Sequence, residues 1–420
     1  MIKARHVILR PSAREAALLK ATQQEAARCW NAILEEEKAF REANAGRWIS
    51  KSDLQKRLKR RFALHSQTVQ ALTDKFAANR DTAATNRRQG LDTHYPWRQK
   101  TFLTVPFKQM AIRRSETGSL ELTLAAGVRF DTGFIPQSLV RTAEILWRKG
   151  RYVLTYTSEY AEADPVASGL RAGGDIGEIH PVALCAEDGS GLVVSGREVR
   201  SIKRRRNKSL GQFARALARC KKGSRRWKKL RRARARMKSK SDNQVRDLLH
   251  QATRKAVNWC AEHQVSELLI GDPSGVEKNT RRKKRLNRTA RQKVSQMEAG
   301  RTKHYLRYKA KEAGIATCLV KEHGTSRDCP VCGSQNHVRG RTYRCSGCGF
   351  AAHRDGKAAF LMIRKKYSDL PLPPSFDIRH VQSYPKYRKR TTLPACVDGP
   401  DEARSSLVIA EPLGGARSAA

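Results

Sequence analysis

The first 168 residues change twice between the apolar pattern of a strand and that of a helix. Residues 5–10 form a short apolar run that predicts a strand. Apolar residues then recur at helical spacing through 12–90, and 95–160 returns to the alternation typical of strands, most clearly in Arg151 to Tyr160. Because the helical stretch lies between one strand and several others, the pattern predicts a β-barrel that carries a helical insertion.

The next section alternates strands with long helices. Gly173 to Ala186 and Leu192 to Ser195 predict two strands joined by a turn, and a long helical stretch follows. Two amphipathic helices then lead into two apolar strands, Glu267 to Ile270 and Ala316 to Val320. This order predicts an α/β sheet whose later strands run parallel to the first. From Tyr367 onward the sequence is basic and Pro-rich without periodicity, which predicts a disordered tail.

The balance of charges predicts what kind of partner the protein binds. The 420 residues include 85 Lys and Arg against 39 Asp and Glu, so the formal net charge is +46. Nucleic acid is the natural polyanion to neutralise this excess, because each phosphate contact releases a counterion. No run of 18 apolar residues exists, and the N-terminus lacks the apolar core of a signal peptide. The sequence therefore predicts a soluble cytoplasmic protein without a membrane partner, and it leaves the oligomeric state open.

The basic residues are concentrated in two stretches. Residues 197–240 contain 21 Lys or Arg and one acid, Glu198, while apolar residues still recur at helical spacing. A break at 221–224 predicts a helical hairpin whose basic outer faces contact a nucleic-acid backbone; a merely solvated face is the alternative. A second cluster at Arg281 to Lys293 predicts a further phosphate contact. The candidate contact residues of both stretches are Lys203, Arg204, Arg205, Arg206, Arg225, Arg226, Lys228, Lys229, Arg231, Arg232, Arg281, Arg282, Lys283 and Lys284.

Four of the ten cysteines form two CxxC pairs, Cys329 with Cys332 and Cys345 with Cys348, separated by twelve residues. Four thiolates at this spacing suit a tetrahedral Zn²⁺ site. Because protein ligands fill all four positions, the pattern predicts a structural zinc ribbon and no chemistry at the metal. Four unligated thiols and a redox CxxC are the alternatives.

Two acids stand out in so basic a chain because of their apolar surroundings. Asp175 follows two glycines in the first strand of the α/β section, and Asp355 opens an apolar helix just after the cysteines. Carboxylates that converge are what a two-metal nuclease requires to hold Mg²⁺. The alternatives are an Asp that caps a turn at 175 and an ordinary helix N-cap at 355.

The order of these motifs resembles that of the TnpB family, transposon-encoded RNA-guided nucleases related to type V CRISPR effectors. The resemblance rests on the Asp175 strand, the basic hairpin, Ile270-Gly271-Asp272, Thr325-Ser326 before the cysteines, and Arg354-Asp355-x-x-Ala358-Ala359. It implies a RuvC-like, RNase H-type α/β domain with an inserted zinc ribbon, preceded by a wedge-like β-barrel with a helical recognition insertion. Asp175 would match the first catalytic aspartate and Asp355 the last.

The resemblance implies a multi-domain chain with the following boundaries: the wedge-like barrel at 1–11 and 91–168, the recognition insertion at 12–90, the nuclease domain at 169–324 and 352–366, the ribbon at 325–351, and the tail at 367–420.

One position departs from the family pattern. Many members carry Glu-Asp after the middle strand, where this chain has Gly271-Asp272. In one interpretation the site is broken and the protein binds DNA without cutting it. In the other, Glu322 at the end of the neighbouring strand supplies the acid, because strands lie about 4.8 Å apart and Gly271 has no side chain to obstruct it. Asp272 is a weaker candidate, since successive residues of a strand face opposite ways.

Together with these features, the resemblance implies an RNA-guided DNA endonuclease in which Asp175, Glu322 and Asp355 hold two Mg²⁺ ions. Its expected partners are a guide RNA and double-stranded DNA with a short flanking motif, in the nucleoid of a bacterial host. The rival hypotheses are a nuclease-deficient RNA-guided repressor and a strand-transferring transposase that works without RNA.

Overall fold

The computed structural model describes residues 2–135, 140–160, 162–273, 287–337 and 340–383. The candidate residues Arg281, Arg282, Lys283 and Lys284 lie outside the described residues, as does most of the predicted tail. No helix in the described ranges is long and apolar enough to cross a membrane.

The N-terminal half consists of three helices inserted after the first strand, followed by six more strands. The helices are α1 (Ala13–Ala43), α2 (Lys51–Arg57) and α3 (Ser66–Arg88). The strands are β1 (Ile2–Ile8), β2 (Val105–Phe107), β3 (Ile112–Arg114), β4 (Ser119–Ala125), β5 (Val128–Phe134), β6 (Val140–Arg148) and β7 (Arg151–Glu159), with a 3₁₀ turn, η1, at Gln109–Ala111.

The expected β-barrel is not confirmed. Within the described ranges, hydrogen bonds divide the strands between a four-stranded sheet, β1-β7-β6-β2, and a three-stranded sheet, β3-β4-β5. The helices and both sheets share one core, in which Trp30 and Phe76 of the helices are buried with Phe107 and Leu154 of the strands. Burial of this shared apolar face holds the helices on the sheets.

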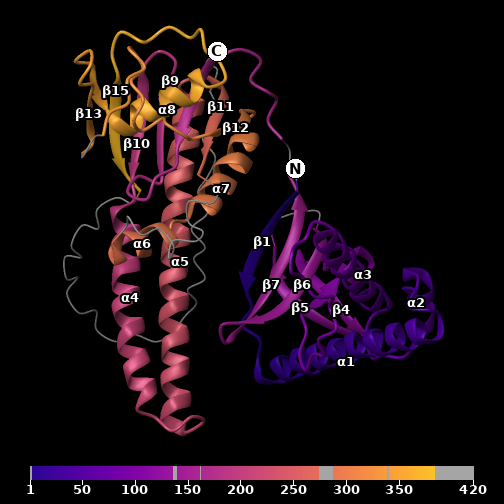
Figure 1. The fold of residues 1–420 in the computed structure, drawn as a ribbon. Coiled ribbons are helices and arrows are strands. Elements are labelled where there is room, and N and C mark those ends of the chain that lie inside the picture. The colour runs from indigo at the N-terminus through magenta and orange to yellow at the C-terminus, as the bar shows by residue number, and fades with distance from the viewer. Residues whose placement is uncertain (1, 136–139, 161, 274–286, 338–339, 384–420) are drawn as a thin grey trace, which may run out of the picture. The chain divides into compact units, whose positions relative to one another are not determined.

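A six-stranded sheet forms the centre of the C-terminal half (Figure 1). Its order is β12-β11-β8-β9-β10-β15, and β11 and β12 run parallel to β8. Its strands are β8 (Leu170–Asp175), β9 (Val182–Ala186), β10 (Ser190–Ser195), β11 (Val265–Asp272), β12 (Ala316–Lys321) and β15 (Asp377–Gln382). The predicted α/β arrangement with parallel later strands is therefore confirmed.

Two sequence predictions for this sheet were wrong. Gly173 to Ala186 is two antiparallel strands, because the Gly177 N–H donates to the His180 carbonyl and closes a turn before Pro181. The disordered tail does not begin at 367, because β15 pairs in parallel with β10 along its whole length. Only two of its six residues, Ile378 and Val381, are partly buried, so its apolar pattern is too weak to announce a strand.

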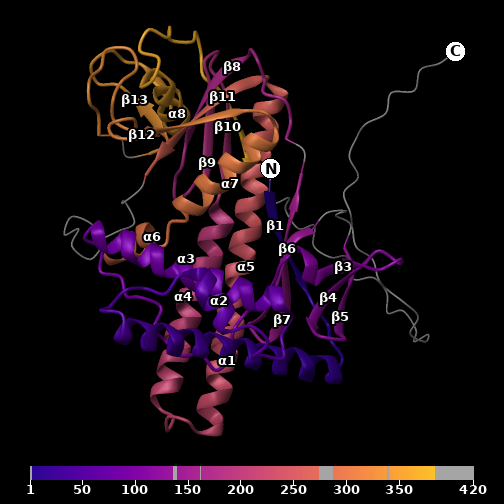
Figure 2. The ribbon, with the colours of Figure 1, turned by 90° about the vertical axis from the view of Figure 1, so that its right-hand side faces the viewer.

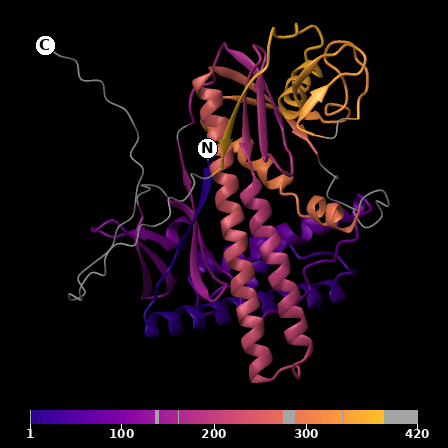
Figure 3. The same cartoon turned by 90° about the vertical axis from the view of Figure 1, so that its left-hand side faces the viewer.

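Helices cover both faces of this sheet (Figure 2). On one face α8 (Arg354–Arg364) packs against β8 and β9, and on the other lie α5 (Arg225–Glu262) and α7 (Ala299–Glu312). The predicted basic hairpin is formed by α4 (Arg197–Ala218) and the first half of α5, which run side by side away from the sheet (Figure 3). The short helix α6 (Arg288–Ser295) precedes α7, and β13 (Thr342–Arg344) pairs with β14 (Ala351–His353) next to the cysteines.

Helix α8 approaches β8 unusually closely at Gly173. A Cβ atom at this position would lie 1.8 Å from the Ala359 carbonyl oxygen of α8, far inside van der Waals contact. Any side chain at 173 would force the helix off the sheet. The glycine therefore sets the distance between β8, which ends at Asp175, and α8, which begins beside Asp355.

We expect Gly173→Ala to lower the melting temperature of the protein markedly, since overpacking a buried contact costs about 1–3 kcal/mol or more. Gly300→Ala in α7 is the matched control, because nothing lies within 4 Å of its Cβ position. Alanine is a better helix former than glycine, so this control should be neutral or slightly stabilising. Thermal unfolding of both variants checks the expectation, and equal melting temperatures would contradict it.

Candidate functional site

Three acids come together from three elements on the face of the sheet that α8 covers. Asp175 ends β8, Glu322 directly follows β12, and Asp355 lies in the first turn of α8. Residues two apart in a strand share a face, so Asp175 lies on the same side as Gly173, which contacts α8. The same rule puts Gly271 on the side of Leu269, which packs in the cluster formed with α8.

The side chain of Glu322 occupies the space above Gly271. A Cβ atom at 271 would lie 2.4 Å from Glu322 Oε1 and 2.7 Å from its Cγ. Glu322 also accepts a hydrogen bond from the Ile176 N–H, next to Asp175. The carboxylate of Glu322 thus lies where the sequence departs from the family pattern.

Glu322 and Asp175 are poorly compensated acids. Burial and, to a smaller extent, the charge of Asp355 raise the pKa of Asp175 to about 7. Burial likewise raises the pKa of Glu322 to about 8, with a contribution from Asp175. Glu322 Oε1 is buried and has no hydrogen-bond partner among the described residues. These two carboxylates are close enough to disfavour each other's ionisation.

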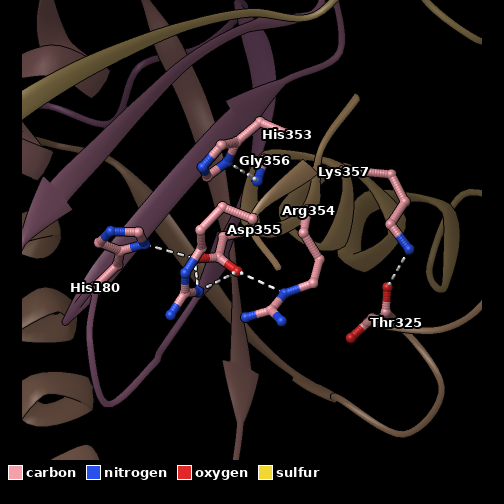
Figure 4. Close-up of polar contacts among 8 residues, drawn as sticks. His180, Thr325, His353, Arg354, Asp355, Gly356 and Lys357 are labelled. Atoms are coloured by element: carbon pink, nitrogen blue, oxygen red, sulfur yellow. Dashed lines mark hydrogen bonds and ion pairs between the residues drawn. The ribbon is translucent and has the colours of Figure 1, made fainter. Parts of the chain in front are cut away.

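Asp355, by contrast, is surrounded by hydrogen-bond donors and cations that favour its ionised form (Figure 4). His180 Nδ1 lies 2.6 Å from its Oδ2, and the Arg341 guanidinium donates to both oxygens at 3.0 and 2.7 Å. Arg354 Nε donates to Oδ1 at 3.2 Å. Burial alone would raise the pKa of Asp355, but the His180 hydrogen bond and the two guanidinium groups hold this pKa well below its usual range. The carboxylate is therefore ionised and turned toward cations of the chain itself.

Neither Asp175 nor Asp355 has the structural role that was the alternative for it, a turn cap at 175 and a helix N-cap at 355. The N-cap of α8 is His353, whose Nδ1 accepts a hydrogen bond from the Gly356 N–H, so Asp355 is not the cap. The turn after Asp175 is closed by Gly177 and His180. Asp272 faces the other side of the sheet, where Lys303 of α7 donates to it at 2.7 Å.

A buried lysine ties α8 to the cysteine region. The ammonium group of Lys357 donates to the carbonyl oxygens of Thr325 and Asp328 at 2.9 and 2.8 Å, and it lies 3.9 Å from the centre of the Tyr343 ring. Burial lowers the pKa of Lys357 to about 8. Lys357 was not among the residues predicted from the sequence, although a lone lysine in an apolar helix is a visible signal. His180 and Arg341 were not predicted either, because no local pattern marks them.

The four cysteines meet as predicted. Within the described ranges, they are the one set of three or more potential metal ligands whose donor atoms all lie within 4.8 Å of one another. Cys332 Sγ lies 3.5 Å from Cys345 Sγ, and Cys329 Sγ lies 3.6 Å from Cys348 Sγ. Tetrahedral sulfur ligation with Zn–S bonds of about 2.3 Å requires separations of this kind. The three carboxylates do not form such a set.

The basic hairpin has the predicted seam and outer faces. Its helices are separated by a turn in which Ser224 caps α5, and Leu210, Leu217 and Trp227 are half-buried along the seam. Two candidate contact residues are engaged within the chain: Lys203 contacts Glu298, and Arg206 pairs with Asp242 at 2.9 Å. The remaining candidates on the hairpin are exposed, namely Arg204, Arg205, Arg225, Arg226, Lys228, Lys229, Arg231 and Arg232.

A groove of about 840 Å³ lies beside this hairpin. It runs between α4 and α6, and its cationic lining includes Arg204, Lys208 and Lys293. The groove reaches Arg341, the residue that binds Asp355. A phosphodiester chain placed here would be attracted along its length.

Comparison with known proteins agrees with this arrangement, an α/β fold that carries a four-cysteine cluster. A family model described as "Probable transposase" matches residues 154–277, and one described as "Cas12f1-like, TNB domain" matches residues 300–362. The chain is 25% identical over 122 residues to a TnpB-like protein of Methanocaldococcus jannaschii, a match that covers 29% of this chain and 42% of that protein. The match thus spans less than half the length of this curated relative. Segments of this chain are therefore similar to the TnpB family.

The fold is also similar to that of a solved effector. The protein chain of a Cas12f1–sgRNA–target DNA complex superposes with a TM-score of 0.57 at 12% identity, covering 84% of both chains. At this identity the likeness concerns the fold alone.

The raised pKa of Glu322 predicts how stability depends on pH. Its pKa in the unfolded chain is near the usual 4.5, whereas in the folded chain it is about 8. The unfolded state therefore releases its proton first, and the protein loses stability as pH rises between these values. We expect Glu322→Gln to raise the melting temperature at pH 8 but not at pH 4, in buffer without added Mg²⁺. The exposed Glu42→Gln is the control, and a gain that does not depend on pH would contradict the expectation.

Proposed function

We propose that the protein is an RNA-guided DNA endonuclease whose RuvC-like, RNase H-type core hydrolyses phosphodiester bonds with Asp175, Glu322 and Asp355. The observation that carries the proposal is the side chain of Glu322, which fills the space above Gly271 beside Asp175. An acid is therefore present where the usual one is missing. The order of the sheet and the close packing of α8 support the assignment of the core.

The three acids are the residues that would hold divalent cations. Glu322 Oε1 is buried without a partner, and both Glu322 and Asp175 are disfavoured as anions, so this donor set fits a hard cation that prefers oxygen ligands. Two Mg²⁺ ions there would supply an activated water and stabilise the leaving oxygen. Within the chain, His180 orients the Asp355 carboxylate, and Arg341 and Arg354 keep it ionised.

The basic surfaces would bind the guide RNA and the DNA. The exposed cations of the α4–α5 hairpin suit the backbone of an RNA–DNA heteroduplex, while base pairing supplies the specificity. The groove that ends at Arg341 would lead a DNA strand to the acids. The N-terminal half, with its wedge-like sheets and helical insertion, would read a short flanking motif. The similar Cas12f1 chain was solved with a guide RNA and target DNA, which supports these partners.

A nuclease-deficient RNA-guided repressor is the second candidate. One observation favours it: the Asp355 carboxylate accepts three guanidinium hydrogen bonds and a contact from His180, which neutralise it without a metal. In that case the acids would be a structural remnant, and the protein would act by occupying DNA.

Cleavage by the purified ribonucleoprotein with Mg²⁺ separates the two candidates. We expect Asp175→Ala, Glu322→Ala and Asp355→Ala each to abolish cleavage of a matched DNA target while leaving RNA binding intact. Asp272→Asn is the control, because its side chain faces α7, and it should retain activity. Full activity of Glu322→Ala would exclude this acid, and an inactive parent protein that binds its target would support the repressor. Sequencing the copurified RNA tests the guide itself, since a transposase that works without RNA would carry none of defined sequence.

The side chain of Glu322 lies in the space that a side chain at position 271 would occupy, so the acid can be moved from one position to the other in a rescue experiment. Glu322→Ala empties the space above residue 271, and Gly271→Glu in the same chain would refill it with a carboxylate. We expect the double variant to regain cleavage that Glu322→Ala lacks, and Gly271→Gln with Glu322→Ala to remain inactive. If both double variants stay inactive although they fold, the acid cannot act from position 271 in this chain.

The cysteine cluster should contain one zinc ion per chain with a structural role. Because each ligand is needed for tetrahedral closure, we expect Cys345→Ser to lose the metal and to become sensitive to proteolysis around residues 325–351. Elemental analysis of the purified protein measures this directly. Cys318→Ser, at a partly buried cysteine outside the cluster, is the control and should retain the zinc. Zinc-free parent protein that resists proteolysis equally would contradict the assignment.

A further inference from the structure

A second cavity lies at the helical insertion, and the cavity itself has no role in the function proposed above. It has a volume of about 500 Å³, within the range of roughly 300–1,000 Å³ that is usual for pockets that bind small organic groups. It opens beside the last turns of α3, which Figure 2 shows above α1. Its lining consists of Trp48, Arg80, Asp81, Ala84, Arg87, Arg88 and Tyr95.

Three aromatic rings form one wall of this cavity and the support behind it. Trp48 stacks on Trp97 with ring centres 5.4 Å apart and an angle of 13°, and Tyr95 lies against Trp48 at 5.0 Å. Trp48 and Trp97 also pack on the core shared by the helices and sheets. All three side chains are only partly buried, so the wall is fixed in place and still offers ring surface to a ligand.

Arginines surround these rings. The Arg41 and Arg80 guanidinium groups lie 4.1 and 5.4 Å from the Trp48 ring centre, and that of Arg87 lies 5.4 Å from Tyr95. Asp81 is the one acid of the lining, and it pairs with Arg80 at 3.0 Å. Arg87 and the exposed Arg88 have no carboxylate partner within the described ranges, so their positive charge is uncompensated there.

This combination selects for one kind of ligand. A planar ring can stack on Tyr95, whereas the Trp48 ring already contacts Trp97 and Arg41. A phosphate beside the planar ring can pair with Arg87 and Arg88. A quaternary ammonium group would use the aromatic wall but would be repelled by the arginines, and a small carboxylate would leave the ring surface unused. We propose that the cavity binds one unpaired nucleotide of a nucleic acid, with its base against the aromatic wall and its phosphate on Arg87 and Arg88. The inference rests on the proposed function only in that nucleic acid is the partner.

Zero-length photocross-linking tests this site directly. The full chain is irradiated with two oligonucleotides of the same sequence, an RNA with 4-thiouridine and a DNA with 4-thiothymidine, and the cross-linked peptides are mapped by mass spectrometry. We expect a cross-link at Trp48 or Tyr95. Arg87→Ala with Arg88→Ala should lower its yield about tenfold, which corresponds to roughly 1.4 kcal/mol. Tyr95→Phe should retain the cross-link at Trp48, because the ring is kept.

The controls separate this site from general charge attraction. Arg10→Ala with Arg14→Ala removes two exposed arginines outside the cavity, and Phe102→Ala removes an aromatic side chain that is 48% exposed. Neither should change the yield. A cross-link from the RNA, the DNA or both supports the site and identifies its source, whereas cross-links confined to other regions overturn it. Asp175→Ala should cross-link like the parent chain, so loss of cleavage and loss of this site remain distinguishable.

Discussion

The packing of α8 on β8 is the contact on which the candidate site depends. Gly173 allows the Ala359 carbonyl to reach the position that a side chain would fill, and so brings the first turn of α8 to the end of β8. Asp355 and Asp175 become neighbours for this reason, although 180 residues separate them. The cysteine region lies between β12 and α8 in the chain, and Lys357 attaches it to α8 through two carbonyl oxygens. A change in the ribbon would therefore reach the acids through α8.

The site is built at a cost to stability, and its acids are compensated unequally. Burial of Asp175 and Glu322 beside each other disfavours their charged forms, and nothing in the described part of the chain bonds Glu322 Oε1. Asp355, by contrast, is held by His180, Arg341 and Arg354. A purely structural cluster would be satisfied throughout, because an unpaired buried acid can be replaced by an apolar residue at little cost. This imbalance agrees with the proposed binding of a cation by these acids.

Much of the site could be predicted from short sequence patterns, because the residues of each pattern themselves form the feature that it predicts. Two CxxC pairs suffice to predict a cluster of potential metal ligands, and Gly271 beside a strand that is directly followed by Glu322 suffices to place an acid across two strands. The features that the sequence did not show depend on residues that are far apart in the chain. His180 and Arg341 acquire meaning only through Asp355, and β15 is a strand because β10 offers it an edge. The aromatic cavity likewise joins residues on both sides of α2 and α3, with no spacing that would reveal it.

The geometry at Gly271 also explains why the acid and the glycine must occur together. Register pairs Gly271 with Val320, so Glu322 begins one residue beyond the last pair and its side chain folds back across β11. A side chain at 271 would occupy the position of the Glu322 carboxylate, and a glycine there without Glu322 would leave a buried gap next to Asp175. Each single change is therefore unfavourable in this chain, through a clash in one case and a void in the other. The absence of the usual acid at 271 is thus the condition for the presence of Glu322, and it is a poor argument for a site that has lost its chemistry.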